Sequence, residues 1–76
     1  MEEKITAWVV RDENMSLYLF FVKPKKNEGY KCWDIEYDEG MWGTYSKLGK
    51  DIFPRVKWED KEPTEVELTI KILNND

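Results

Sequence analysis

Residues 17–22 read LYLFFV, and this stretch decides the fold expected for the chain. Every side chain in it is apolar or aromatic, so both faces of a strand built from it would have to be covered. A strand that is covered on both faces lies inside a sheet and not at its edge. We therefore expect residues 16–23 to form the central strand of a β-sheet.

The segment before this stretch, residues 5–10 (ITAWVV), is also rich in β-branched and aromatic side chains. Its odd and even positions would face opposite sides of a strand. Residues 11–14 (RDEN) between the two segments are all polar, which is typical of a turn. The sequence thus predicts a β-hairpin made of residues 5–10 and 16–23.

On the other side of the central stretch, Pro24 ends the strand, because proline cannot donate to a sheet ladder. Residues 25–29 (KKNEG) are expected to form a turn. Residues 30–37 (YKCWDIEY) alternate in a way that predicts a third strand with one face in solvent. Residues 65–72 (EVELTIKI) alternate without a break, which predicts a half-buried last strand.

The remaining segment is less regular. Three glycines interrupt residues 38–50, which we expect to be a loop or an irregular strand pair. Residues 51–54 (DIFP) are typical of a single helical turn, with Phe53 pointing into the core. Residues 56–58 are a candidate short strand. The sequence therefore predicts an all-β domain, an antiparallel meander sheet or small open barrel of four or five strands with one short helical turn. An α+β fold is the alternative if residues 46–55 form more helix.

Length and composition restrict the class of protein further. A chain of 76 residues is too short for two cores, so we expect one domain over residues 1–76. The single cysteine, Cys32, excludes an intramolecular disulfide and favours a reducing compartment. The first residues lack the charge pattern of a signal peptide, and no apolar run approaches the ~20 residues of a membrane-spanning helix. These features predict a soluble, cytoplasmic protein that does not enter a membrane.

The residues needed for most catalytic mechanisms are missing. The chain contains no histidine, which removes the commonest general base and the commonest zinc ligand. Three carboxylates at Asp34, Glu36 and Asp38 do not match a calcium-binding loop, because the glycine and glutamate that such a loop requires are absent at the matching positions. We expect no enzymatic activity, no cofactor and no metal site.

Aromatic residues make up 14% of the chain, which is more than so small a core can bury. Met41, Trp42 and Tyr45 stand among glycines in the irregular segment, where no strand period requires them. Exposed aromatic side chains in loops are common anchors for partners. We therefore expect these three residues to bind a protein partner, or a second copy of the chain in a homodimer.

Binding of single-stranded nucleic acid is the alternative function. Small barrels often stack bases on aromatic side chains beside lysines. The residues that could do so are Lys25, Lys26, Tyr30, Lys31 and Trp33. The net charge of −4 weighs against this alternative.

Four segments also resemble a group of known sequences: residues 7–12 (AWVVRD), 16–20 (SLYLF), 53–60 (FPRVKWED) and 62–68 (EPTEVEL). They are similar to short uncharacterised proteins encoded by gut bacteria and their phages. The resemblance implies a phage or mobile-element origin. It implies no function and no site residue.

Overall fold

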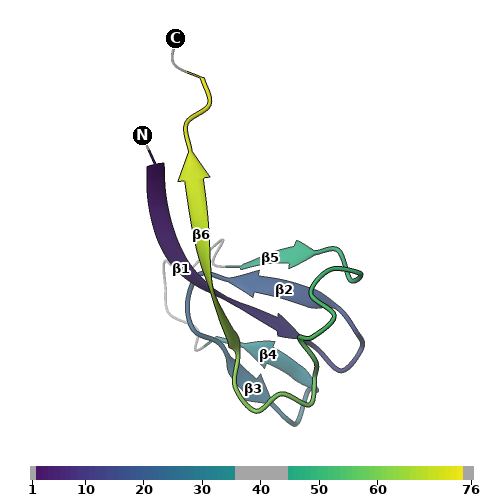
Figure 1. Ribbon diagram of the computed structural model, residues 1–76. Coiled ribbons are helices and arrows are strands. Elements are labelled where there is room, and N and C mark those ends of the chain that lie inside the picture. The colour runs from purple at the N-terminus through teal and green to yellow at the C-terminus, as the bar shows by residue number, and fades with distance from the viewer. Residues whose placement is uncertain (1, 36–44, 75–76) are drawn as a thin grey trace.

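Strands form all the regular secondary structure in the part of the chain that is described. The computed structural model describes residues 2–35 and 45–74. The strands in these residues are β1 (Glu2–Arg11), β2 (Leu17–Phe20), β3 (Lys25–Asn27), β4 (Cys32–Asp34), β5 (Tyr45–Leu48) and β6 (Thr64–Lys71). β5, β2, β1 and β6 form a four-stranded antiparallel sheet in that order, and β3 and β4 form a separate two-stranded sheet (Figure 1). The all-β class is therefore confirmed, and the described strands form antiparallel sheets that do not close into a barrel.

The central position of β2 is also confirmed, because β2 lies between β5 and β1. Leu17 and Phe20 are both buried, and they point to opposite faces of the sheet. Leu17 packs with Val9 and Val56 on one face, whereas Phe20 packs with Val10 and Trp33 on the other. The two apolar faces of the LYLFFV stretch therefore belong to two different core clusters.

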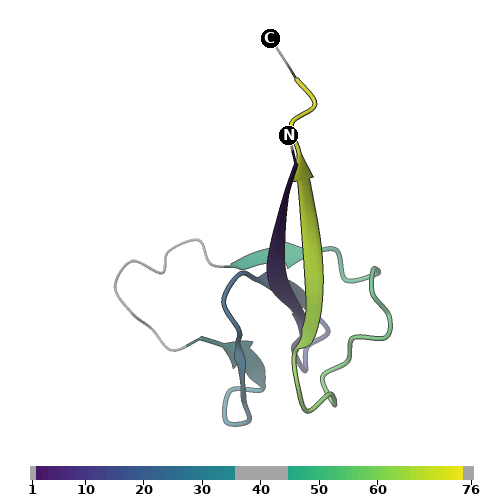
Figure 2. The ribbon, with the colours of Figure 1, turned by 60° about the vertical axis from the view of Figure 1, so that its left-hand side comes forward.

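A different segment of the chain packs against each face of the four-stranded sheet. Figure 2 shows the β3–β4 hairpin on one side of the long β1–β6 pair and the connection from β5 to β6 on the other. Trp33 of β4 is the buried contribution of the hairpin, and Val56 is that of the connection. The domain thus has three layers, of which only the middle one is an extended sheet.

The outer half of the β1–β6 pair projects beyond the rest of the sheet. β6 pairs with residues 2–9 of β1, whereas β2 pairs only with residues 8–11. Residues 2–7 and 66–71 therefore form a two-stranded ribbon with no third strand beside it among the described strands (Figures 1 and 2). We call this ribbon the arm.

The strand predicted at residues 30–37 is wrong in length and in position. Only Cys32–Asp34 is a strand in the described residues, and it pairs with β3, which occupies part of the predicted turn at residues 25–29. The turn comes later because Asn27 Oδ1 accepts hydrogen bonds from the N–H groups of Gly29 (3.0 Å) and Tyr30 (3.1 Å). Side-chain bonds of this kind hold an asparagine-initiated turn. Lys31 completes it with a φ of 57°.

The segment after β5 also differs from the prediction. Residues 51–54 form no helical turn, and residues 56–58 form no strand, so the α+β alternative is wrong. Phe53 was expected in the core but is 48% exposed, and Val56 takes the buried position. The carbonyl groups of Lys50, Ile52 and Phe53 converge on the side chain of Arg11, as described below, whereas the carbonyl groups of a helical turn would all point along its axis.

Candidate functional site

The three residues predicted to bind a partner are only partly described. Met41 and Trp42 lie outside the described residues. Tyr45 begins β5 and is 56% exposed. Its ring stacks on Phe20 with centroids 5.4 Å apart and meets the ring of Tyr18 edge-on at 5.9 Å. One face of Tyr45 therefore covers the core, and its remaining surface is open to solvent.

The residues of the nucleic-acid alternative all lie on the β3–β4 hairpin, but they do not share one surface. Trp33 is only 5% exposed, and its Nε1 donates to the carbonyl oxygen of Arg11 at 3.1 Å. Lys25, Tyr30 and Lys31 are exposed. Because Trp33 is enclosed in the core, its ring has no open face on which a base could stack.

Lys26 is directed toward the core side of the hairpin. Its Nζ lies 4.2 Å from the ring centroid of Trp58 and 5.5 Å from that of Trp33, and it donates to the carbonyl oxygen of Trp58. A cation held over two indole rings is part of the packing. The contact also brings the lysine-rich hairpin next to the segment that leads into the acidic residues 59–62. These positions weaken the case for a basic binding groove.

Arg11 is the most highly connected polar side chain among those described. It is 4% exposed, and its guanidinium donates to the carbonyl oxygens of Val56 (2.7 Å), Met15 (2.9 Å), Lys50 (3.0 Å), Ile52 (3.1 Å) and Phe53 (3.3 Å). A guanidinium has five N–H donors, so all of them are used. Arg11 thus fastens the connection after β5 to the end of β1. Sequence analysis placed it in a turn and missed this role.

Asp12 joins the two sheets next to Arg11. It is 9% exposed, and its Oδ1 accepts a hydrogen bond of 2.9 Å from the backbone N–H of Trp33. Burial raises the pKa of Asp12 above its ordinary value of 3.8, the hydrogen bond from Trp33 lowers it in part, and the Asp34 carboxylate raises it further. Asp12 therefore has a structural role, and burial disfavours the charged form of its carboxyl group.

This raised pKa gives a testable pH dependence. Above pH 3.8 the unfolded chain releases the Asp12 proton, whereas the folded chain keeps it until the pH reaches the raised pKa. The contribution of protonated Asp12 to the free energy of unfolding is therefore complete below pH 3.8 and is lost as the pH rises through the folded pKa. We expect Asp12→Asn to remove this decline of stability with pH, because asparagine does not titrate. Its Oδ1 can still accept the hydrogen bond from the Trp33 N–H group. Urea denaturation of both proteins across this range measures it. A difference between them that does not change with pH would contradict the assignment.

Cys32 precedes Trp33 in β4 and is half-buried. Burial raises the pKa of its thiol, and the Asp12 and Asp34 carboxylates raise it further. A raised pKa keeps the sulfur protonated at neutral pH, which is the opposite of what a nucleophilic cysteine needs.

A pocket of about 480 Å³ lies beside Arg11 at the far end of the sheet from the arm. Met15, Pro54, Val56 and Trp58 supply its apolar wall. Its charged lining residues are Arg11, Lys50, Lys57, Glu13, Asp51 and Glu59, so positive and negative groups are balanced. Arg11 is already saturated by carbonyl groups, and the pocket offers no excess charge for an anion or a cation.

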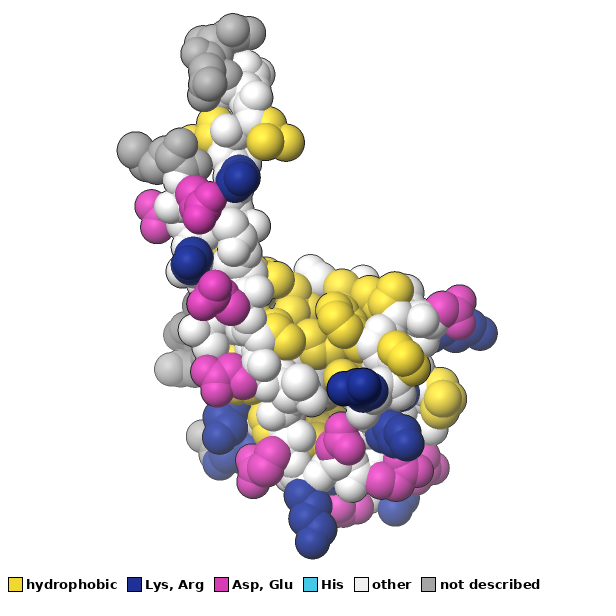
Figure 3. Space-filling view, in the orientation of Figure 1, with side chains coloured by type: hydrophobic (Ala, Val, Ile, Leu, Met, Phe, Trp, Pro, Cys, Tyr) yellow, Lys and Arg dark blue, Asp and Glu magenta, His cyan; other side chains and the backbone are white. Residues whose placement is uncertain are grey.

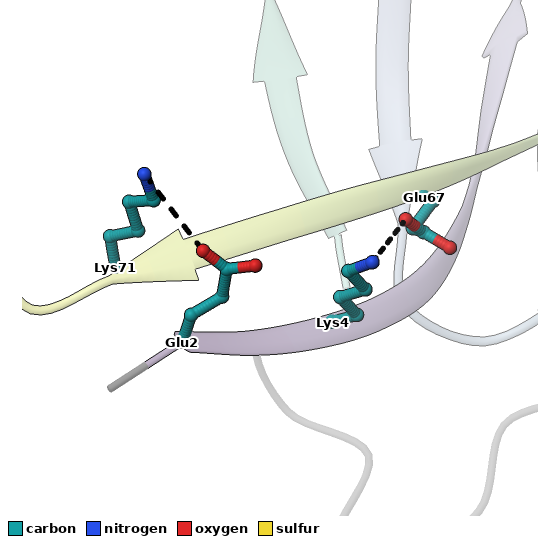
Figure 4. Close-up of polar contacts among 4 residues, drawn as sticks. All are labelled: Glu2, Lys4, Glu67 and Lys71. Carbon is teal, nitrogen blue, oxygen red and sulfur yellow. Dashed lines mark ion pairs between the residues drawn. The ribbon is translucent and has the colours of Figure 1, made fainter.

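The two faces of the arm differ in character. On one face Lys4 Nζ lies 4.0 Å from Glu67 Oε1, and Lys71 Nζ lies 3.9 Å from Glu2 Oε2 (Figure 4). All four side chains are at least 44% exposed, and ion pairs in solvent stabilise a fold by only about 0–1 kcal/mol. This face is an ordinary solvated surface.

The opposite face of the arm carries large aliphatic side chains. Ile5 and Leu68 lie directly opposite each other, Ile70 lies opposite Glu3, and Ile72 follows the end of β6. The exposed fractions are 37% for Ile5, 51% for Ile70 and 58% for Ile72. We call Ile5, Leu68, Ile70 and Ile72 the apolar arm face. The prediction of a half-buried last strand holds for Val66 and Leu68, whereas Ile70 and Ile72 are exposed.

The apolar surface continues from the arm onto the body of the domain. Figure 3 shows hydrophobic side chains gathered beside the base of the arm. By the strand register, Leu19 of β2 and Leu48 of β5 share the face of the sheet to which Val66 and Leu68 point. Contiguous apolar surface of this kind, next to a charged rim, is typical of interaction sites.

Other site types find no support in residues 2–35 and 45–74. These residues contain no group of three or more acidic, cysteine or histidine side chains placed to hold a metal ion. The same part of the chain has no helix long and apolar enough to cross a membrane. In comparisons with known proteins, the chain matches no family model, no curated protein and no solved structure.

Proposed function

We propose that the chain is a small non-catalytic interaction module that docks on a protein partner through the apolar arm face. The observation that carries the proposal is the exposure of Ile5 and Ile70 on a ribbon whose other face is covered with charged side chains, with the exposed Ile72 directly after the ribbon. Exposed isoleucines in a row gain about 25 cal/mol for each Å² that a partner covers.

The chemistry of the chain supports a binding role over a catalytic one. The chain has no histidine, and the raised pKa of Cys32 disfavours its thiolate. The buried polar groups, Arg11 and Asp12, are occupied by hydrogen bonds that hold the fold. The lone cysteine fits the reducing conditions of the cytoplasm, where we place the protein.

Site-specific photo-crosslinking tests the proposal. A benzophenone amino acid is placed at Ile70 on the apolar arm face and, as a matched control, at Thr6 on the charged face of the same ribbon. We expect irradiation in cells to attach a polypeptide at position 70 and not at position 6. Both positions are exposed, so both variants should fold as the unchanged protein does. Equal yields of the same products at the two positions would contradict a face-specific site.

A further inference from the structure

The free edge of β6 is a second feature of the arm. β6 pairs with β1 over all of Thr64–Lys71, and β1 is its only neighbour among the described strands. The pairing runs without a bulge, and the strand contains no proline. An edge of this kind presents unpaired N–H and C=O groups that can bind another strand.

We propose that this edge pairs with the β6 edge of a second copy, in an antiparallel arrangement with a two-fold axis at Thr69. This inference rests on the proposed function: it makes a second copy the partner of the β6 edge, and it leaves the apolar arm face open to the partner proposed above. The two sheets would join into one eight-stranded sheet. The apolar arm faces of the two copies would then form one continuous surface on the same side.

The sequence of β6 is complementary to itself in this register. A two-fold axis perpendicular to the sheet keeps each face on its own side, so only residues of the same face can lie opposite each other. Centred on Thr69, the pairing sets Glu67 opposite Lys71 of the second copy. On the other face it sets Leu68 opposite Ile70, and Val66 opposite Ile72.

Neighbouring registers match less well. Centring on Glu67 places two glutamates directly opposite each other, which is destabilising. Centring on Ile70 leaves Glu67 opposite Leu73. Centring on Leu68 brings Glu65 opposite Lys71 but sets Ile72 against Thr64. Of these registers, only the one centred on Thr69 combines the opposite charges of Glu67 and Lys71 on one face with the apolar pairs Leu68–Ile70 and Val66–Ile72 on the other. Its mismatch, Glu65 opposite Leu73, lies beyond these pairs.

Charge exchange tests the pairing. Glu67→Lys and Lys71→Glu each place like charges opposite one another twice in a homodimer, and we expect each to weaken dimerisation about tenfold or more. Mixing the two variants restores opposite charges at both places, so the mixture should dimerise as the unchanged protein does. Each variant loses one exposed ion pair within the arm, which affects folding little. Sedimentation equilibrium from micromolar to millimolar concentration measures all three samples.

Glu65→Lys is the matched control. Position 65 lies opposite Leu73 of the second copy in the proposed register, so this variant should dimerise as the unchanged protein does. It lies opposite Lys71 when the register is centred on Leu68. Weakening by Glu65→Lys with none by Glu67→Lys would overturn the register.

A disulfide test locates the axis independently. In a Cys32→Ser background, Thr69→Cys should form an intermolecular disulfide on oxidation, because directly opposite Cβ atoms lie about 4.5–5.5 Å apart. Leu68→Cys, one residue away and on the other face, should form it less. The reverse order would overturn the proposal.

The proposed function and the dimer can fail separately. A protein that stays monomeric at millimolar concentration, yet crosslinks to another polypeptide at Ile70, overturns the dimer and leaves the interaction module standing. A monomer that also gives no crosslink at Ile70 overturns both. Crosslinked products at twice the 9.2 kDa mass of the chain support the dimer, and products of a different mass at Ile70 support a partner on the apolar arm face.

Discussion

Arg11→Met is expected to lower the free energy of unfolding by about 3–5 kcal/mol, which is enough to unfold most of so small a domain. The substitution keeps the aliphatic length of the side chain and removes all five donors. Five carbonyl groups, one in the β1–β2 turn and four in the β5–β6 connection, then each lose a hydrogen bond in a partly buried region. A hydrogen bond to a charged group contributes about 1.5–3 kcal/mol, although contributions in one network do not add.

Urea denaturation measures the effect, and two further variants interpret it. Arg11→Lys keeps the charge, but its three donors on one nitrogen cannot reach five carbonyl groups, so we expect most of the loss to remain. Arg55→Met removes an exposed arginine from the same connection and should change the stability by less than about 0.5 kcal/mol. A loss below about 1 kcal/mol for Arg11→Met would show that water replaces the guanidinium.

The role of Arg11 explains why the β5–β6 connection could not be predicted. Its carbonyl acceptors lie 4 to 45 residues away along the chain, so no local pattern contains the interaction. A local interpretation favoured a helical turn capped by Asp51, and the long-range bonds to Ile52 and Phe53 overrode it. By contrast, the apolar run in residues 17–22 correctly predicts a central strand, because both of its faces need cover. The strand is shorter than predicted: it ends at Phe20, and Phe21 is 41% exposed.

The arm shows another limit of a local pattern. Alternation in residues 65–72 correctly identifies a strand and the side chains that share a face. It carries no information on whether a second layer covers that face. The cover on this face is the β5–β6 connection, whose Val56 packs with Val9 and Leu17 at the inner end of the sheet. The register of β1 with β2 and β6 carries the outer part of the β1–β6 pair beyond it, since β2 reaches only as far as Trp8. The apolar arm face is therefore a product of strand register, which sequence analysis did not address.

The candidate nucleic-acid-binding residues also include some that the structure buries and some that it exposes. The nucleic-acid alternative groups Trp33 and Tyr30 with Lys25, Lys26 and Lys31, because aromatic side chains beside lysines can stack bases. The hairpin instead folds back against the sheet, and Lys31 lies in the turn with a positive φ. Trp33 is then buried while Tyr30, three residues earlier, is 82% exposed. The docking of the hairpin depends on Asp12 and Arg11, which lie on another strand or directly after it.

Trp33→Ala is therefore expected to cost about 3–5 kcal/mol of stability, as for a buried tryptophan in a core. Trp33 lies in the cluster of Val10 and Phe20, and it supplies the buried apolar contact between the hairpin and the sheet. Its Nε1 donates to the carbonyl oxygen of Arg11 at 3.1 Å, and its ring lies beneath the Lys26 ammonium. Removing the ring leaves a cavity, an unpaired carbonyl group and a hairpin of two three-residue strands. A two-stranded hairpin is marginal in water without such packing.

Thermal and urea unfolding of three variants separate these contributions. Trp33→Phe keeps an aromatic ring and loses the hydrogen bond, so we expect it to cost much less than Trp33→Ala. Tyr30→Ala removes a ring from the exposed turn of the same hairpin and should change stability by less than about 0.5 kcal/mol. If Trp33→Ala proved as mild as Tyr30→Ala, the ring could not be the link between the two sheets. The tryptophan would then be available for binding, and the nucleic-acid alternative would regain the aromatic platform that its burial removes.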